Sequence, residues 1–117
     1  MARQSTEIGD DVPDIRLLLF VSSQCPHCPK AEYLVKKIAP EYYDKGLSYK
    51  KVRLKTPEGK QYSEKYNVMS TPTALFINQD GSEINRLVGV PSENELRDKI
   101  ESNLGVKKSF FAKLFGK

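Results

Sequence analysis

The chain contains few of the residues that build disulfide frameworks or metal sites. Its 117 residues include two cysteines and one histidine, and all three lie in the tetrapeptide Cys25-Pro26-His27-Cys28. Two cysteines inside one short motif exclude a framework of structural disulfides. Structural zinc needs four ligands, and His27 lies between the cysteines, where it cannot easily reach the same ion. We expect a redox-active Cys25–Cys28 disulfide and no bound cofactor, with a metal shared between two copies or an iron–sulfur cluster as the alternatives.

Long apolar runs are also absent. No segment approaches the ~20 apolar residues needed to cross a bilayer. The longest run, from Ile15 to Val21, is interrupted by Arg16. Residues 1–14 are polar and acidic and contain no apolar segment of the kind found in secretory signal peptides. These absences predict a cytoplasmic protein rather than a secreted or integral membrane protein.

Size, composition and charge narrow the class of protein further. At 13.3 kDa, with 38% hydrophobic and 29% charged residues, the chain fits one soluble globular domain. The net charge is +4, and residues 105–117 contribute four lysines and no acidic residue, so the rest of the chain is balanced. Because the body of the chain has no clear basic stripe interleaved with aromatic residues, we do not expect nucleic-acid binding.

We divide the chain into a flexible lead-in (residues 1–14), a folded domain (15–104) and a basic amphipathic tail (105–117). On a helical wheel, apolar residues of the tail lie opposite polar and basic ones: Phe110, Phe111, Leu114 and Phe115 against Ser109, Lys113 and Lys117. Such a segment can bind an anionic membrane surface or an acidic partner. The alternative is a helix that folds back on the protein's own surface, or a frayed terminus.

The first half of the domain reads as strand, helix, strand, helix. A near-continuous apolar run predicts a buried strand over residues 15–22, the kind found in parallel sheets. Apolar residues at helical spacing predict a helix over 26–44, with a kink at Pro40. A less buried strand over 47–55 and a short, poorly defined helix over 56–66 follow.

The second half reads as a hairpin and a last helix. Two short apolar runs, 73–78 and 83–88, flank the glycine-containing connection 79–81, which predicts two antiparallel strands. Ser92 and the glutamate three residues later have the spacing of a capping box. The helix that begins there can end at Gly105.

Two further motifs make the pattern specific. Ser70-Thr71-Pro72-Thr73 precedes the third predicted strand, and Gly89 follows the hairpin. With the cysteine motif after the first strand, the chain resembles the thioredoxin superfamily over about residues 15–104. The resemblance implies an α/β fold with a central mixed four-stranded sheet flanked by helices. It also implies a cis Thr71–Pro72 peptide bond beside the cysteines and assigns substrate binding to Thr71 and Pro72.

The chain departs from typical thioredoxins next to the cysteines. Leu19 occupies the place of their buried aspartate, and Gln24 stands where their tryptophan precedes the first cysteine. We therefore expect no obvious acid or base beneath Cys28, so that removal of its proton depends on solvent, His27 or Lys51. For Lys51 we favour an exposed lysine on a strand.

The position of each cysteine indicates its role. Cys25 lies at the start of the predicted helix, where free N–H groups favour a thiolate, so we assign it as the attacking thiol and Cys28 as the resolving thiol. His27 would favour the Cys25 thiolate electrostatically, or else fill a turn as an exposed polar residue. Pro26 would fix the backbone of the first helical turn. Gly89 would allow close backbone approach near the dithiol, or else serve as a simple turn glycine.

These observations favour a thiol–disulfide oxidoreductase that exchanges protein disulfides through Cys25 and Cys28. We expect it to act as a reductant and electron carrier, supplied by an unidentified thioredoxin-reductase-type or thiol donor. Pro26 joins Thr71, Pro72 and Gly89 as a candidate for contact with the substrate. One alternative is a redox-sensing adaptor module, and another is a glutathione-dependent enzyme like the glutaredoxins. The direction of electron flow depends on the redox potential, which residue spacing does not determine.

Overall fold

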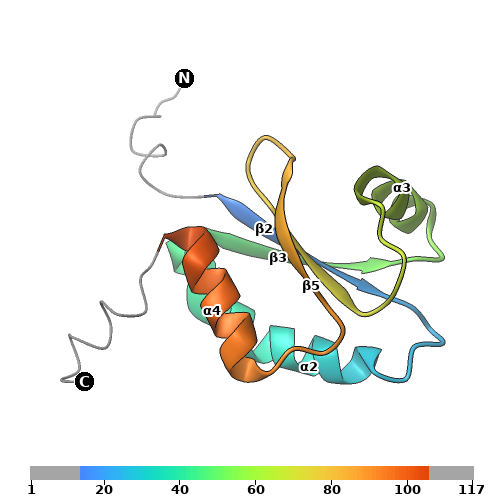
Figure 1. The fold of residues 1–117 in the computed structure, drawn as a ribbon, viewed down its shortest axis with the longest axis horizontal. Helices are drawn as coiled ribbons and strands as arrows, with labels where there is room; N and C mark the ends of the chain where they lie inside the picture. Colours follow the sequence, from blue (N-terminus) through green and yellow to red (C-terminus); the bar gives the residue numbers. More distant parts are fainter. Residues whose placement is uncertain (1–13, 106–117) are drawn as a thin grey trace.

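The computed structural model describes residues 14–105, which form four strands, three α-helices and one 3-10 helix (Figure 1). In chain order these are β2 (Ile15–Val21), α2 (Cys28–Ile38), the 3-10 helix η1 (Ala39–Lys45), β3 (Leu47–Arg53), α3 (Pro57–Tyr66), β4 (Thr73–Ile77), β5 (Glu83–Val88) and α4 (Glu93–Leu104). Apart from Asp14 and Gly105, the predicted lead-in and amphipathic tail lie outside the described residues. Between residues 14 and 105, no helix is long and apolar enough to cross a membrane.

The four strands form one mixed sheet in the order β3-β2-β4-β5. Strand β2 runs parallel to β3 and antiparallel to β4, and β5 is antiparallel to β4. All residues of β2 except Arg16 are buried, as the near-continuous apolar run predicts for a central strand. The predicted α/β fold with a mixed four-stranded sheet is therefore confirmed.

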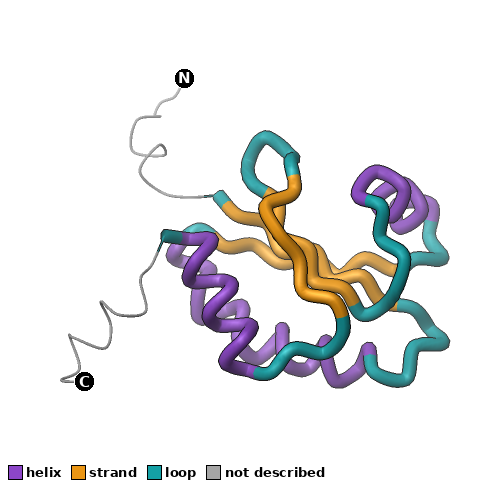
Figure 2. Tube along the Cα trace, in the orientation of Figure 1, coloured by secondary structure: helices purple, strands orange, loops and turns teal. Residues whose placement is uncertain are grey.

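Helices cover both faces of this sheet. Figures 1 and 2 show α2 and α4 on one face and α3 on the other. Successive residues of β2 point to opposite faces, so Leu17 and Leu19 pack in the core beneath α2 and α4, whereas Leu18 and Phe20 pack in the core beneath α3. Burial on both sides makes β2 the element on which the other layers are assembled.

The first helix is shorter than predicted. It begins at Cys28 rather than at Pro26, which lies in the preceding turn, so the assignment of Pro26 to the first helical turn was wrong. At Ala39 the chain continues as the 3-10 helix η1, with Pro40 in its first turn. Proline has no N–H to donate to the preceding turn, so a change of helix type replaces the predicted kink. Gly46, with φ at 110°, ends η1.

The remaining predicted elements are present, with small differences at their ends. Strand β3 stops at Arg53, two residues before the predicted end. Helix α3 begins after Thr56, whose side chain caps it, and the hairpin strands β4 and β5 are antiparallel. Ser92 and Glu95 form the predicted capping box of α4, which ends at Gly105. Sequence signals within each segment were therefore sufficient to predict these elements.

Helix α3 packs closely against the end of β3 through a glycine. Gly59 is buried, and a Cβ atom at this position would overlap the backbone carbonyl of Arg53. The Thr56 hydroxyl donates to the same carbonyl at 2.8 Å and accepts a hydrogen bond from the Gly59 N–H at 2.9 Å. The connection is therefore tight and leaves no room for a side chain at position 59.

Gly59→Ala should lower the free energy of unfolding by about 1–3 kcal/mol, the usual cost of overpacking. At an exposed helical site the same change would stabilise by up to about 1 kcal/mol, so the sign of the effect tests the packing. Urea unfolding measures it. Gln61→Ala, at an exposed position of the same helix, is the control and should change stability by no more than about 0.5 kcal/mol. Unchanged or increased stability in Gly59→Ala would contradict the close approach.

Candidate active site

The two cysteines form a disulfide where β2 leads into α2. Cys25 follows a short loop after Val21, and Cys28 is the first residue of α2. Their Cα atoms are 5.4 Å apart, and the Cys28 N–H donates to the Cys25 carbonyl at 3.3 Å. Cys28 is only 1% exposed, whereas Cys25 is partly exposed. The two sulfurs thus differ in their access to a substrate.

Pro26 and His27 fill the turn between the cysteines. Both are exposed. His27 precedes the first helical residue, and its side chain makes no capping hydrogen bond to the helix. Its carbonyl accepts a hydrogen bond from the Ala31 N–H at 3.3 Å. His27 therefore lies between the two cysteines in the chain, with an exposed side chain that does not cap the helix.

Thr71 and Pro72 lie immediately before β4. Their peptide bond is cis, Pro72 is buried, and Thr71 is partly exposed. Thr73 pairs with Phe20 in the sheet, so β4 begins at the edge where β2 ends and the loop to Cys25 starts. The sheet register therefore brings the Thr71–Pro72 segment to the same edge as the dithiol.

Gly89 is connected to this segment by a backbone hydrogen bond. Its N–H donates to the Pro72 carbonyl at 2.8 Å. Gly89 has φ at +91°, and a Cβ atom there would meet nothing within 4 Å. The prediction of a close backbone approach at Gly89 is therefore wrong. The residue is a turn glycine, required because other residues rarely adopt this backbone conformation.

A cavity of about 490 Å³ opens beside the disulfide. It is bounded by the loop after β2, the first turns of α2, and the end of β3 with the turn that follows. Its lining residues are Val21, Ser22, Ser23, Cys25, Cys28, Pro29, Glu32, Lys51, Arg53, Leu54, Lys55 and Thr56. Both cysteines thus share one cavity with charged side chains from two different elements.

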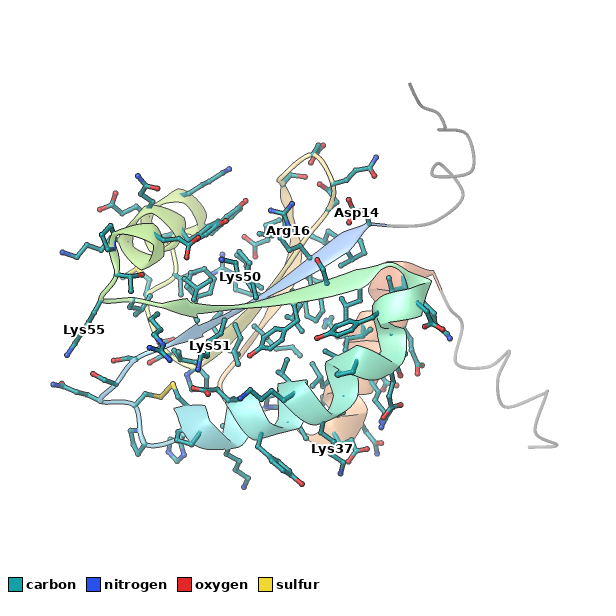
Figure 3. All side chains as sticks on the ribbon, turned by 180° about the vertical axis from the view of Figure 1, so that it is seen from behind. Asp14, Arg16, Lys37, Lys50, Lys51 and Lys55 are labelled. Carbon is teal, nitrogen blue, oxygen red and sulfur yellow. A yellow bond between two sulfur atoms is a disulfide. The ribbon has the colours of Figure 1, made fainter. Side chains whose placement is uncertain are left out.

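Two of these charged side chains form an ion pair. Lys51 Nζ donates to Glu32 Oε1 at 3.3 Å, and the two side chains are 27% and 24% exposed. Figure 3 shows Lys51 on the α2 side of β3 and Lys50 on the opposite side. The expectation that Lys51 is simply an exposed strand lysine is therefore wrong, because burial against α2 brings it to the cavity.

Glu32 is the residue of this cavity that the sequence analysis missed. We expected no acid or base beneath Cys28, because Leu19 stands where typical thioredoxins have an aspartate. Leu19 is indeed apolar and 1% exposed, and it pairs with Lys51 in the sheet. The carboxylate comes from α2 instead. The spacing of Cys28 and Glu32, four residues apart on one helix, was the signal that could have revealed it.

Arg86 forms hydrogen bonds to the end of α3, from which the chain continues to Pro72. From β5, its guanidinium donates to the carbonyls of Tyr66, at 2.6 Å, and Asn67, at 3.3 Å, at the end of α3. It also makes two 2.7 Å hydrogen bonds to the Glu83 carboxylate. These bonds tie the end of α3 to the hairpin, and so limit where the following segment can lie.

The comparisons with known proteins agree with this geometry. A family model described as a thioredoxin-like domain matches residues 11–103. The chain belongs to this family. A probable thioredoxin of Archaeoglobus fulgidus is 36% identical over 91 residues, which cover 78% of this chain and 91% of the relative. A thioredoxin of Methanocaldococcus jannaschii is 30% identical over 90 residues, covering 77% and 96% of the two chains.

Solved thioredoxin structures share the fold. The germline-specific thioredoxin Deadhead of Drosophila melanogaster has a TM-score of 0.66 at 23% identity, covering 84% of this chain and 89% of its own. Fasciola hepatica thioredoxin has a TM-score of 0.66 at 26% identity, covering 82% and 86%. With thioredoxin relatives and a disulfide-bonded Cys-x-x-Cys pair, this thioredoxin-like protein is a thiol–disulfide oxidoreductase. Within residues 14–105, no group of three or more His, Cys, Asp or Glu side chains could hold a metal ion.

The Arg86–Glu83 contact should make stability depend on pH. Hydrogen bonding to Arg86 lowers the pKa of the Glu83 carboxyl below its ordinary value of 4.5. A lowered carboxyl pKa contributes stability above the unfolded-state pKa, and this contribution is lost as the pH falls through the folded-state pKa. Glu83→Gln should therefore be less stable than the wild type at pH 7, and the difference should shrink below about pH 4.5.

Urea unfolding at several pH values measures this difference. Glu64→Gln, at an exposed position of α3, is the control and should follow the wild-type curve. A Glu83→Gln deficit that persists unchanged in acid would show that ionisation of Glu83 does not contribute.

Proposed function

We propose that this protein reduces protein disulfides in the cytoplasm, with Cys25 as the attacking thiol and Cys28 as the resolving thiol. The unequal exposure of the two sulfurs carries the proposal: Cys25 is accessible to a substrate, and Cys28 is buried beneath it. Only an accessible thiolate can meet a disulfide on another protein. The buried Cys28 is suited to the second step, in which it attacks Cys25 within the same chain. This step does not require the client to reach Cys28.

The start of α2 supports Cys25 as the nucleophile. The first backbone N–H groups of a helix lack intrahelical partners and carry partial positive charge, which stabilises a nearby thiolate. We propose that His27, when protonated, adds a positive charge beside the same sulfur. The reduced protein would attack the client disulfide to form a mixed disulfide, and Cys28 would then attack Cys25. The client leaves reduced, and the Cys25–Cys28 disulfide remains.

We propose that Thr71 and Pro72 contact the client chain next to the disulfide, together with Pro26 in the exposed turn. The register between β2 and β4 supports this, because Thr71 and the loop to Cys25 share one edge of the sheet. Gly89 would act indirectly, through its hydrogen bond to the Pro72 carbonyl. An extended client segment at this edge could be held through backbone hydrogen bonds.

The proposed direction of electron flow, from this protein to its clients, is consistent with the proposed cytoplasmic compartment. Both cysteines of the chain lie in the active site, as expected for a protein of the reducing cytoplasm rather than one stabilised by disulfides. The two curated relatives are named as thioredoxins. We therefore propose a reductant, regenerated by a reductase or a thiol donor acting on the Cys25–Cys28 disulfide.

The wild-type protein should accelerate the reduction of insulin by dithiothreitol, measured as precipitation of the freed chains. Cys25→Ser should remove the acceleration, because the attacking sulfur is gone. Cys28→Ser keeps Cys25 and serves as the matched variant. It should accumulate a mixed disulfide with insulin that is visible by mass spectrometry under non-reducing conditions.

The outcome of this pair tests the assignment of roles. Trapping by Cys25→Ser rather than by Cys28→Ser would reverse the two roles. No acceleration by the wild type, with both cysteines reduced, would oppose the proposal of a protein disulfide reductant.

The redox potential tests the direction. Equilibration in glutathione buffers, followed by a count of free thiols by mass, should give a potential near −270 mV, about the value of a thioredoxin. His27→Ala should be more reducing than the wild type, because a charge that favours the thiolate stabilises the reduced form. A wild-type potential near −120 mV, about that of a strong oxidase, would reverse the proposed direction.

A further inference from the structure

The second step of the reaction poses a proton-transfer problem. A thiol attacks a disulfide as the thiolate, so Cys28 must lose its proton before it can attack Cys25. Cys28 is 1% exposed and packs among Ala31, Val35 and other apolar residues of the core beneath α2. Burial keeps bulk water away from this thiol and disfavours a charge there. Its proton therefore needs an acceptor inside the protein.

Glu32 is placed to be that acceptor. It lies one helical turn after Cys28 on α2, so the two side chains share a face of the helix. Cys28 and Glu32 both line the cavity beside the disulfide. Glu32 is the one acidic residue among the described residues that line it. A cavity of about 490 Å³ has room for water, which can bridge a thiol and a carboxylate.

Three basic side chains line the cavity with Glu32. From β3, Lys51 pairs with it at 3.3 Å, and Arg53 lines the same cavity, as does Lys55 from the turn after β3. The Tyr49 hydroxyl, also on β3, is buried and has no hydrogen-bond partner among the described residues. Burial, and then the charge of Glu32, raises the pKa of Tyr49 to about 12, so the tyrosine stays neutral. The lining residues from α2 and the preceding turn that can ionise, besides Glu32 itself, are Cys28 and Cys25 in their reduced form.

The other candidates are less suitable. Leu19, opposite Lys51 in the sheet, has no titratable group. Lys51 is a cation and has no lone pair with which to accept a proton while it is charged. The His27 side chain is exposed and is not among the residues that line the cavity.

We propose that Glu32, held by Lys51, accepts the proton of Cys28 when Cys28 resolves the mixed disulfide. This inference rests on the order of attack proposed above. The Cys28 S–H bond breaks, and its proton passes to the Glu32 carboxylate directly or through one water. The Cys28 thiolate attacks the Cys25 sulfur, forming the Cys25–Cys28 bond and breaking the bond to the client. The client thiolate leaves with the electron pair, and protonated Glu32 returns the proton to it, which restores the carboxylate.

The two steps can be followed separately with dithiobis(nitrobenzoate) as the substrate. The reduced protein releases one coloured thiolate when Cys25 attacks and a second when Cys28 displaces the reagent from Cys25. Stopped-flow absorbance records both releases. The second phase reports the step that Glu32 is proposed to assist, and the first phase reports only Cys25.

Glu32→Gln should slow the second phase at pH 7 by about tenfold or more, since general bases contribute roughly 10²–10⁴-fold. Its first phase should stay within about twofold of the wild type. The deficit should shrink as the pH rises, because hydroxide then replaces the carboxylate as the acceptor. Glu32→Asp, which keeps a carboxylate, should recover part of the lost rate. If the glutamine variant does not fold, Glu32→Ala is expected to behave in the same way.

Glu58→Gln is the matched control. Glu58 pairs with Lys50, the strand neighbour of Lys51, at the same 3.3 Å, but on the α3 side of the sheet and at a more exposed site. This variant should leave both phases unchanged. A second phase in Glu32→Gln equal to that of the wild type at every pH, or equal slowing of both phases, would overturn the proposal. A first phase that persists in the Cys25→Ser variant would instead overturn the proposed roles of the cysteines.

Discussion

The pairing of β2 with a strand on each side is the interaction on which the rest of the structure depends. Because β2 is parallel to β3 and antiparallel to β4, its last two residues lie beside the end of one neighbour and the beginning of the other. Three segments far apart in the chain therefore meet at one edge of the sheet: the loop to Cys25, the Thr71–Pro72 segment and the end of β3. Strand β2 is buried on both faces, so sliding this register would expose core residues on each side.

The chemistry follows from how α2 begins at that edge. The chain turns sharply after β2, so Cys25 stays at the surface, and Cys28 enters the core as the first residue of the helix. One disulfide thus joins an accessible sulfur to a buried one. That asymmetry separates exchange with a client from the intramolecular step, and it leaves the buried thiol dependent on the side chains that surround it.

Adjacent lysines on β3 show how the sheet gives similar residues different surroundings. Lys50 and Lys51 each pair with a glutamate at 3.3 Å, but their side chains lie on opposite faces of the strand (Figure 3). The Lys50–Glu58 pair lies at the surface, where such contacts contribute about 0–1 kcal/mol at most. The Lys51–Glu32 pair lies between β3 and α2 beside the cysteines, where its charges act on the active site. Sequence position alone does not distinguish these two lysines.

Features that depend on interactions between nearby residues could be predicted from the sequence. The apolar run of β2, the hairpin, the capping box at Ser92 and the cysteine motif at a helix start are all readable within a few residues. Features that depend on contacts between distant segments became visible only in the folded chain. Glu32 and Lys51 lie 19 residues apart in sequence and meet only because α2 packs across β3. Likewise, Gly89 was assigned a close approach from its place in the motif, whereas its need for positive φ appears only in the folded hairpin. Long-range packing, rather than local preference, sets both environments.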